Sequence, residues 1–365
     1  MTGVDVTQKR VTARTREWRN VDYETFHSEI RPLNRPAVLK GLVGDWPVVR
    51  AARQSRQALH DYIRQRDTGN PVETYLGAPA IKGVFAYHDD VSGLNFERRL
   101  QPFHETMAAV IALAERSDAP ALFAPGTMGT NLPEFCRENG LDILKDADVR
   151  LWGGNAVTTA THYDTMDNVA CVAAGRRRFT LFPPDQLRNL YIGPLDLTPG
   201  GMPTSLVRIA DPDLERHPDY AKALVAGESA ELEAGDALFL PAYWWHNVES
   251  LEPVNLLVNF WWLDAALPPA TPFTALAHGL LAISTLPESH REVWRRMFDH
   301  YVFQTQGDPV PYLPPERRGM LGPMTSQLRT YLRAQIIRSM TRSLPKAIRE
   351  QIQTWMMSAP PAAKD

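Results

Sequence analysis

The sequence predicts a mainly β protein: a jelly roll, or double-stranded β-helix, with flanking helices and a helical appendage at its C-terminal end. Between Leu151 and Leu263 the chain consists of short apolar runs separated by glycine, proline and aspartate, which is typical of antiparallel jelly-roll strands. After Asp264 the pattern becomes helical. The 365 residues, 44% of them hydrophobic, exceed one average domain and can bury a substantial core. We therefore expect a first domain over residues 1–264 and a helical region over residues 265–365.

The part that precedes the predicted jelly roll mixes helices and strands. Helical patterns cover Tyr23 to Ile30, Arg56 to Arg66 and Phe103 to Glu115, and the apolar run from Ala37 to Leu42 predicts a buried strand. Within the jelly roll, the stretch from Tyr191 to Ala230 is rich in proline, glycine and charge. It predicts a long insertion, which is either part of a substrate-binding rim or a plain surface loop.

Near the C-terminal end, apolar residues recur every four positions, the spacing of one helix face. Pro345 can begin a second helix, so the pattern predicts a two-helix appendage. The opposite faces are basic, which suits an anionic membrane surface, but solvated arginines beside a dimer-facing stripe are commoner. We therefore expect a homodimer formed through these helices. The apolar stripe comprises Leu328, Leu332, Ile336, Met340, Leu344, Ile348, Ile352 and Met356, and the basic faces carry Arg329, Arg333, Arg338, Arg342, Lys346 and Arg349.

Charge and cysteine content argue against several classes of protein. The formal net charge of −3 supplies no strong field for nucleic acid, so no nucleic-acid partner is expected. Neither end carries the pattern of a signal peptide, and no apolar run is long enough to span a bilayer. Cys136 and Cys171 are the only cysteines and lie far apart, which predicts a reducing compartment, the cytoplasm by default, rather than a disulfide framework.

The most informative residues are two histidines and an aspartate. His162 and Asp164 are two residues apart, so their side chains share a face only in an extended segment, and we expect both on one strand. His246 ends the apolar run from Ala237 to Trp245, which follows the turn signal Gly235-Asp236, and is expected on a second strand that faces the first across a barrel. Such a triad leaves three octahedral positions open, as in non-haem Fe(II) oxygenases, whereas catalytic zinc sites normally keep one open. The alternative is that each histidine is an ordinary surface or core residue, since the chain has ten.

Several motifs extend this reading to a family. From about Asp22 to Asp264 the chain resembles the cupin-like branch of the JmjC superfamily of Fe(II)- and 2-oxoglutarate-dependent oxygenases, and most closely the type represented by the asparaginyl hydroxylase that acts on hypoxia-inducible factor. The segments that carry the resemblance are Arg35-Pro-Ala-Val-Leu-Lys-Gly41, Asp45-Trp-Pro47, Thr159 to Asn168, Gly175-Arg-Arg-Arg-Phe-Thr-Leu-Phe-Pro-Pro184, Gly235-Asp-Ala-Leu-Phe-Leu-Pro241, Tyr243-Trp-Trp-His246 and Val258-Asn-Phe-Trp261.

The resemblance implies roles for individual residues. It implies that iron is held by the triad His162, Asp164 and His246. It also implies that Thr159, Asn168 and Asn259 line the site of the co-substrate 2-oxoglutarate, and that dioxygen is the third participant. The expected fold is then the cupin or JmjC double-stranded β-helix, with residues 1–264 as the catalytic domain.

Two positions depart from the family pattern. Arg177 stands where the family usually has a lysine that reaches the distal carboxylate of 2-oxoglutarate, and a guanidinium can pair with that carboxylate through its planar fork. A tyrosine that assists the same carboxylate falls near Phe123, which has no hydroxyl. The alternative for Arg177 is a solvated hairpin charge beside Arg176 and Arg178.

The resulting expectation is an oxygenase that hydroxylates a protein or peptide side chain or a small molecule and releases succinate and CO2. Two other classes stay open: a metal-binding cupin without oxygen chemistry, such as a small-molecule sensor, isomerase or hydrolase, and a degenerate relative used as a binding scaffold. The carboxylate of Asp164 and the asparagines favour the oxygenase over the first class. The intact triad argues against the second.

Overall fold

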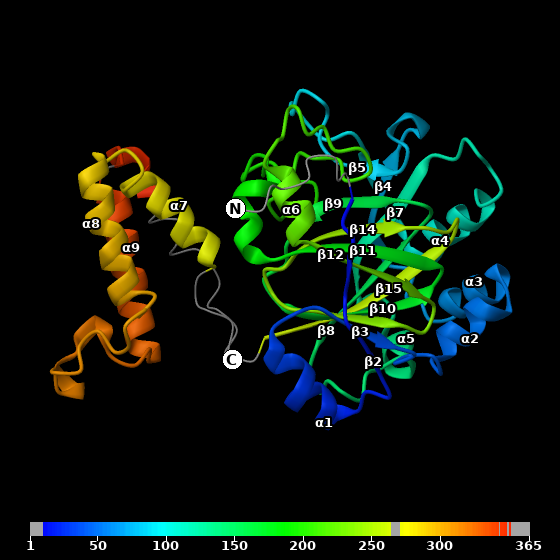
Figure 1. The fold of residues 1–365 in the computed structure, drawn as a ribbon, viewed down its shortest axis with the longest axis horizontal. Coiled ribbons are helices and arrows are strands. Elements are labelled where there is room, and N and C mark those ends of the chain that lie inside the picture. The colour runs from blue at the N-terminus through cyan, green and yellow to red at the C-terminus, as the bar shows by residue number, and fades with distance from the viewer. Residues whose placement is uncertain (1–9, 264–270, 343, 349, 352–365) are drawn as a thin grey trace. The chain divides into compact units, whose positions relative to one another are not determined.

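The computed structural model of the chain describes residues 10–263, 271–342, 344–348 and 350–351. The chain divides into two compact units, residues 1–264 and 265–365. The first unit holds the strands and the candidate site, and the second is helical (Figure 1).

In the described part of the first unit, the strands form two sheets that face one another. The strands are β1 (Ala13–Arg14), β2 (Glu17–Arg19), β3 (Ala37–Lys40), β4 (Pro71–Gly77), β5 (Val84–Phe85), β6 (Glu97–Pro102), β7 (Ala121–Met128), β8 (Asp148–Gly154), β9 (Thr158–His162), β10 (Asp167–Ala174), β11 (Arg176–Phe182), β12 (Glu228–Glu233), β13 (Ala237–Leu240), β14 (Trp245–Ser250) and β15 (Asn255–Trp262). One sheet has the order β1-β12-β11-β14-β9-β5, and the other the order β2-β3-β13-β10-β15-β8-β7-β4-β6. The strands from β8 onward pair antiparallel with one another. The predicted jelly roll is confirmed.

Alternation along the strands fills the space between the sheets. On β10, Ala170 and Val172 point inward, where they meet Phe179 and Leu181 of β11 and Leu257 of β15. All five are buried, as strand residues of one parity must be when their face forms the core. The other parity of β10 packs outward against helices.

Helices cover the outer face of the larger sheet, where their apolar residues join those of β10 and β15 in one core. Ser55 caps α3 (Arg56–Arg64) by accepting a hydrogen bond from the backbone N–H of Ala58 at 3.0 Å. Gly153 of β8 allows α4 (Phe103–Ala112) to approach closely, because a Cβ there would lie 2.5 Å from the sulfur of Met107. The predicted helices are confirmed, and two of the three end slightly earlier than predicted. They are α1 (Tyr23–Thr25), which continues as the π-helix η1 (Phe26–Ile30), then α3 (Arg56–Arg64) and α4 (Phe103–Ala112). Two helices that were not predicted, α2 (Pro47–Gln54) and α5 (Pro133–Glu138), are also present.

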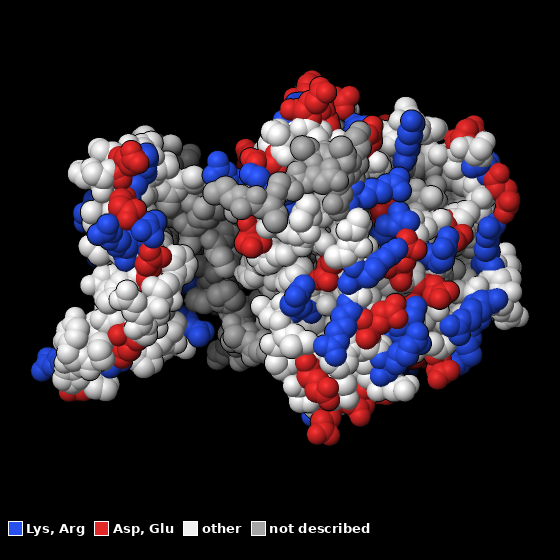
Figure 2. Space-filling view, viewed as in Figure 1, with Lys and Arg blue, Asp and Glu red and all other residues white. Residues whose placement is uncertain are grey.

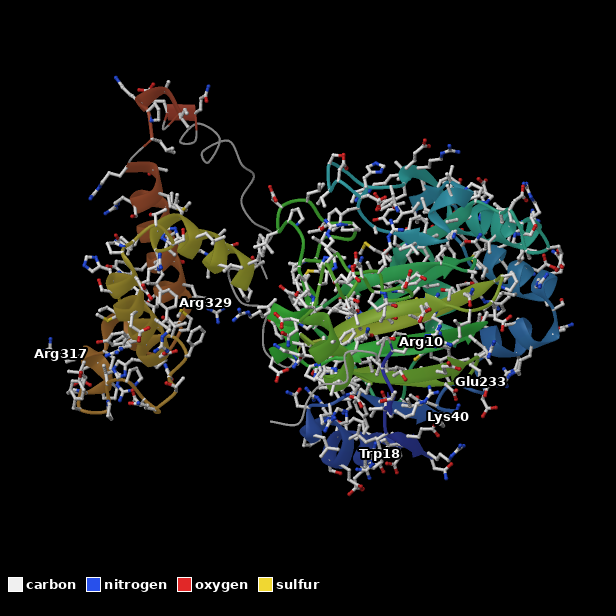
Figure 3. All side chains as sticks on the ribbon, turned by 45° about the horizontal axis from the view of Figure 1, so that its top comes forward. Arg10, Trp18, Lys40, Glu233, Arg317 and Arg329 are labelled. Atoms are coloured by element: carbon white, nitrogen blue, oxygen red, sulfur yellow. The ribbon has the colours of Figure 1, made fainter. Side chains whose placement is uncertain are left out.

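Short 3-10 turns complete the first unit: η2 (Arg31–Leu33), η3 (Pro79–Ile81), η4 (Gly129–Asn131) and η5 (Pro184–Leu190). The predicted turn at Gly235-Asp236 is present, with a φ of 110° at Gly235. Asp236 accepts a hydrogen bond from the backbone N–H of Gly41 at 2.9 Å. Lys40 lies beside Glu233 in Figure 3, and their charged atoms are 3.9 Å apart, so the turn ties β3 of one sheet to β12 of the other.

The insertion between β11 and β12 is ordered and packed onto the sheet. It contains α6 (Tyr220–Ala226), whose Tyr220 is fully buried against Phe182 and Trp245. Backbone hydrogen bonds attach it to the edge of β9, including one of 2.8 Å from Ser205 N to the carbonyl of Thr161. It is therefore not a plain surface loop.

The two helices predicted near the C-terminal end are present, but further helices precede them, so the predicted two-helix appendage was incomplete. The helices α7 (Pro272–Ala282) and α8 (Glu288–Tyr301) precede α9 (Ser326–Arg342), with short turns η6 (Pro315–Arg317) and η7 (Gly319–Leu321) between them. A helix resumes at Lys346, directly after Pro345, while Ile352 and Met356 lie outside the described residues. None of the residues described in α7, α8 and α9 is buried. No helix in the described ranges has the length and apolar character needed to cross a bilayer.

Candidate metal centre

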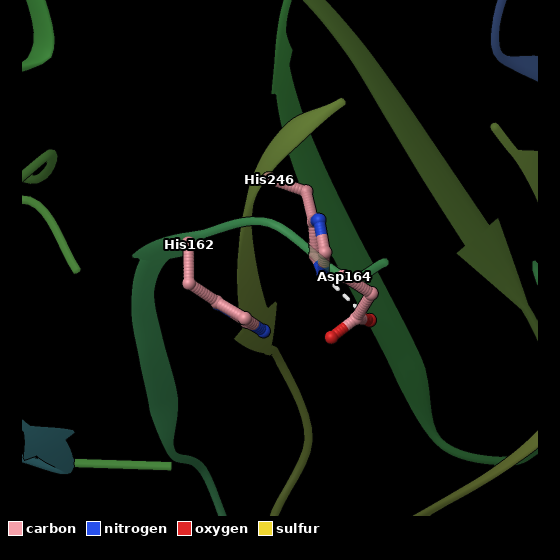
Figure 4. A group of neighbouring side chains, drawn as sticks. All are labelled: His162, Asp164 and His246. Atoms are coloured by element: carbon pink, nitrogen blue, oxygen red, sulfur yellow. Dashed lines mark ion pairs between the residues drawn. The ribbon is translucent and has the colours of Figure 1, made fainter. Parts of the chain in front are cut away.

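Three side chains converge at one end of the space between the sheets (Figure 4). His162 is the last residue of β9, and His246 pairs with it directly from β14. Asp164 follows β9 by two residues. One ligand atom from each residue lies within 4.8 Å of the others, and His246 Nε2 is 3.7 Å from Asp164 Oδ2. This spacing allows one metal ion to contact all three.

The sequence predicted the convergence of these residues but misplaced two of them. Asp164 lies beyond the end of β9 rather than on it. His246 lies near the start of a strand, and that strand neighbours β9 in the same sheet instead of facing it. The predicted run breaks because β13 ends at Leu240, after which Tyr243 takes a φ of 66°. The backbone N–H of Tyr243 donates to the carbonyl of Asp164 at 2.8 Å, which holds the two connecting segments together.

Backbone carbonyls orient both imidazoles. Nδ1 of His162 lies 2.8 Å from the carbonyl of Ala160, and Nδ1 of His246 lies 3.0 Å from the carbonyl of Trp244. A carbonyl only accepts, so each Nδ1 carries the proton and each Nε2 keeps its lone pair for a ligand. Burial lowers the pKa of His246 to about 4, and the neighbouring imidazole of His162 adds to this effect. His246 is therefore neutral at pH 7, the form that binds metals.

A narrow pocket extends from the triad into the space between the sheets. The sequence-predicted residues all line it, although they come from four strands: Thr159 of β9, Asn168 of β10, Arg177 of β11 and Asn259 of β15. The remaining walls are apolar or aromatic and consist of Phe123, Trp152, Phe179, Leu240, Val248 and Leu257.

The sequence did not single out Trp152, which stacks on Phe123 with ring centroids 6.0 Å apart. Its position could have been found by counting strand parity, because Trp152 and Leu257 pair across β8 and β15, and Leu257 has the parity of Asn259.

Arg177 is buried in this pocket, with 2% of its surface exposed. The solvated-hairpin alternative is wrong for Arg177 and right for its neighbours: Arg176 and Arg178 point outward and form ion pairs with Glu252 and Glu231. Gly175, with a φ of 75°, makes the tight turn before β11, and the period-two alternation then turns only the middle arginine inward. Outside, charges of both signs are interleaved (Figure 2).

The buried guanidinium is incompletely paired. One nitrogen, Nη2, donates to the carbonyl of Trp152 at 3.0 Å, while Nε has no hydrogen-bond partner among the described residues. Burial lowers the pKa of Arg177 to about 9, so the side chain is still charged at pH 7. Within the described ranges of the chain, no carboxylate lies at ion-pair distance from it. The buried Oδ1 atoms of Asn168 and Asn259 likewise lack partners there. The buried cation calls for an anionic group, whereas the two amide oxygens accept hydrogen bonds and call for a donor.

Comparisons with known proteins agree with this arrangement. A family model described as a cupin-like domain matches residues 23–266. The chain is 27% identical to lysine-specific demethylase JMJ31 of Arabidopsis thaliana, over 65% of this chain and 47% of that protein. It is 33% identical to tRNA wybutosine-synthesizing protein 5 of Mus musculus, over 76% of this chain and 91% of that protein. It is 30% identical to Jumonji C domain-containing protein 5 of Drosophila melanogaster, over 66% of this chain and 57% of that protein. The chain thus spans about half the length of the demethylase and most of the mouse protein.

Proposed function

The chain belongs to the cupin-like domain family, and on that premise we propose that it is an Fe(II)- and 2-oxoglutarate-dependent oxygenase that hydroxylates a protein or peptide side chain or a small molecule. The observation that carries the proposal is the convergence of His162, Asp164 and His246 beside the buried, incompletely paired Arg177. The match of the family model and the relative named for a Jumonji C domain confirm the resemblance to cupin-like JmjC proteins.

The donor set fits an iron site. It offers two imidazole nitrogens and one carboxylate oxygen on one side of the centre, and a metal with octahedral preference keeps three further positions for other ligands. His162 and His246 would bind through Nε2, because each Nδ1 is engaged with a carbonyl. The chemistry that bound Fe(II) supplies in such a site is activation of dioxygen coupled to decarboxylation of 2-oxoglutarate to succinate and CO2.

Arg177 supports 2-oxoglutarate as the co-substrate. On β11, Arg177 pairs with Ser250 and Leu181 pairs with His246, so the arginine lies four residues from the level of the triad. Four strand residues span roughly 13 Å. A long guanidinium side chain and a dicarboxylate placed end to end can fill that distance. Thr159, Asn168 and Asn259 would then surround the co-substrate with hydroxyl and amide groups.

The remaining walls would exclude water. Phe123 stacks on both Trp152 and Phe85, with ring centroids 6.0 Å apart in each pair, and this aromatic wall closes one side of the pocket. Phe123 and Leu257 are buried as well. A dry pocket strengthens the attraction between Arg177 and a carboxylate, because less water screens the charges.

The same arginine favours an oxygenase over a metal-binding cupin without oxygen chemistry. A sensor, isomerase or hydrolase would need the metal ligands, but its function would not explain why an unpaired cation is buried behind them. Burying a charge without a counter-ion is costly, so we infer that the anion arrives with the ligand.

The relatives do not fix the prime substrate, since their names refer to a lysine in one protein and to a tRNA in another. We propose a protein, peptide or small-molecule substrate, in keeping with the balanced surface charge. We also propose a reducing location, the cytoplasm, because the described Cys136 and Cys171 are both free thiols.

We further propose that the second unit forms a homodimer. Large apolar side chains on its helices are exposed, among them Trp294 of α8 at 46% and Ile336 of α9 at 50%. Apolar surface of this extent normally marks an interface.

Succinate release tests the proposed activity. The purified chain is loaded with Fe(II) without oxygen, mixed with 2-oxoglutarate and a panel of peptides and metabolites, and exposed to air. We expect succinate in excess of the metal-free sample, and a mass increase of one oxygen in the true substrate. His278→Ala, which removes an exposed histidine of α7, is the matched control and should keep full turnover. A metal-loaded chain that neither binds 2-oxoglutarate nor releases succinate would contradict the proposal.

A further inference from the structure

A β-bulge in β9 determines where the side chains of Thr159 and His162 point. His162 pairs with His246, and Thr159 pairs with Val248, so Ala160 and Thr161 together lie opposite the single residue Asn247. One extra residue on one strand is the definition of a bulge.

The bulge changes which side chains share a face. Thr159 and His162 are three residues apart, and regular alternation would point them to opposite sides of the sheet. Both nevertheless line the inner pocket, while Ala160 lines a cavity on the outer face. Thr161 is also buried away from the inner pocket. The extra residue thus brings a proposed metal ligand and a proposed co-substrate residue to the same side.

A bulge interrupts the ladder, so the backbone carbonyls in it need other donors. The carbonyl of Thr159 accepts from the side-chain amide of Asn247 at 2.8 Å. The carbonyl of Ala160 accepts from Nδ1 of His162 at 2.8 Å. The carbonyl of Thr161 accepts from the backbone N–H of Ser205 in the insertion, also at 2.8 Å. Each of the three carbonyls has a partner outside the regular pattern.

Among these donors, Asn247 is a buried side chain next to a proposed metal ligand. It follows His246 directly on β14, points to the outer face, and is 2% exposed. Its Nδ2 must face Thr159, because a carbonyl requires a donor, and its Oδ1 is then buried without a hydrogen-bond partner among the described residues. Its amide therefore stabilises the bulge itself rather than any ligand.

We propose that Asn247 is a positioning residue, which fixes the bulge and thereby aims Thr159 and His162 at the iron and 2-oxoglutarate sites. The inference rests on the proposed function and adds a residue that the resemblance did not assign. Without the amide donor, the carbonyl of Thr159 is buried and unpaired, and the strand relieves this by shifting toward regular pairing. That shift turns His162 away from the inner pocket.

Cobalt binding provides the test, since Co(II) occupies N/O sites of this kind and its visible spectrum reports ligand geometry. The full chain is titrated with Co(II) without oxygen as wild type, Asn247→Leu and Asn247→Asp. We expect both variants to bind Co(II) about ten- to a hundredfold more weakly, the usual effect of losing a group that orients a metal ligand. Their bound spectra should also differ from that of the wild type.

A matched control separates positioning from general stability. Asn139 is also fully buried and donates from Nδ2 to a backbone carbonyl, that of Phe135 at 2.7 Å, but it lies at the end of α5. Asn139→Leu should lower the melting temperature as Asn247→Leu does, yet leave the affinity and spectrum of Co(II) unchanged. Equal loss of affinity in both variants would overturn the inference, and so would unchanged affinity in Asn247→Leu.

A conservative variant completes the design. In Asn247→His, Nδ1 occupies nearly the position of the amide nitrogen, and the outer cavity offers room for the ring. We expect Asn247→His to recover most of the Co(II) affinity that Asn247→Asp loses. Should Asn247→Leu fail to fold, the comparison of Asn247→His with Asn247→Asp tests the inference. Equal Co(II) affinities in these two variants would contradict it. A wild-type chain that binds no Co(II) would instead count against the proposed function.

Discussion

Replacing Arg177 by alanine separates the co-substrate site from the metal site. The guanidinium makes one hydrogen bond to the carbonyl of Trp152 and keeps its Nε without a partner, so it has donors available for a carboxylate. Charge-assisted hydrogen bonds contribute about 1.5–3 kcal/mol. At about 1.4 kcal/mol for each factor of ten, the loss predicts roughly ten- to 150-fold weaker binding of 2-oxoglutarate.

The affinity for iron should change little in the same variant, because Arg177 lies four residues along β11 from the level of His246. Titration of 2-oxoglutarate into Fe(II)-loaded chain, without oxygen, measures both quantities. Arg178→Ala is the matched control, since Arg178 lies next in sequence but points outward to Glu231. Equal affinities for 2-oxoglutarate in wild type and Arg177→Ala would refute the reasoning and leave the co-substrate carboxylate without a named partner.

Three further predictions concern the co-substrate pocket, the dimer and the thiols. Arg177→Lys should recover only part of the lost 2-oxoglutarate affinity, because lysine is shorter and lacks the planar fork of arginine. Adding Phe123→Tyr to Arg177→Lys should recover more affinity, because the tyrosine supplies a hydroxyl in the same pocket. Titration of 2-oxoglutarate into the single and double variants checks this, and no gain from the tyrosine would contradict it. The dimer should become a monomer when the chain ends at Gly322, or when Ile336→Glu and Met340→Glu are introduced on the exposed face of α9. Light scattering measures the mass, and an unchanged mass would place the interface elsewhere. Burial raises the pKa of Cys136 to about 11 and raises the pKa of Cys171 well above its usual value, so the reactive thiolate is scarce below pH 9. A thiol reagent at pH 8 should therefore label both cysteines only after unfolding. Rapid labelling of the native chain would be inconsistent with this expectation.

The parts of the fold that follow from local pattern could be predicted. Short apolar runs between turn residues predicted the strands, and the spacing of His162 and Asp164, with His246 after a second run, predicted that the three would meet. Periodicity and turn chemistry are local properties, so the sequence displays them directly.

Other features depend on partners distant in sequence. The segment that forms the bulge in β9 contains no glycine or proline, the residues that usually indicate such an irregularity. The hydrogen-bond donors to its carbonyls, Asn247 and Ser205, come from later segments of the chain. Burial of Arg177 between two solvated arginines follows from strand parity, which becomes visible only once the turn at Gly175 is placed. The helices α7 and α8 were predicted only as part of a helical region after Asp264. In α8, Val293, Met297 and Tyr301 recur every four residues, and this spacing could have located the helix.

The central claim is that His162, Asp164 and His246 hold an iron that turns over 2-oxoglutarate. It is tested most directly by measuring succinate release from 2-oxoglutarate with Fe(II)-loaded wild type and Asp164→Ala side by side. Because two imidazoles alone cannot maintain the facial arrangement, we expect turnover by the wild type and none above background by the variant. Full retention of 2-oxoglutarate turnover in Asp164→Ala would contradict the claim.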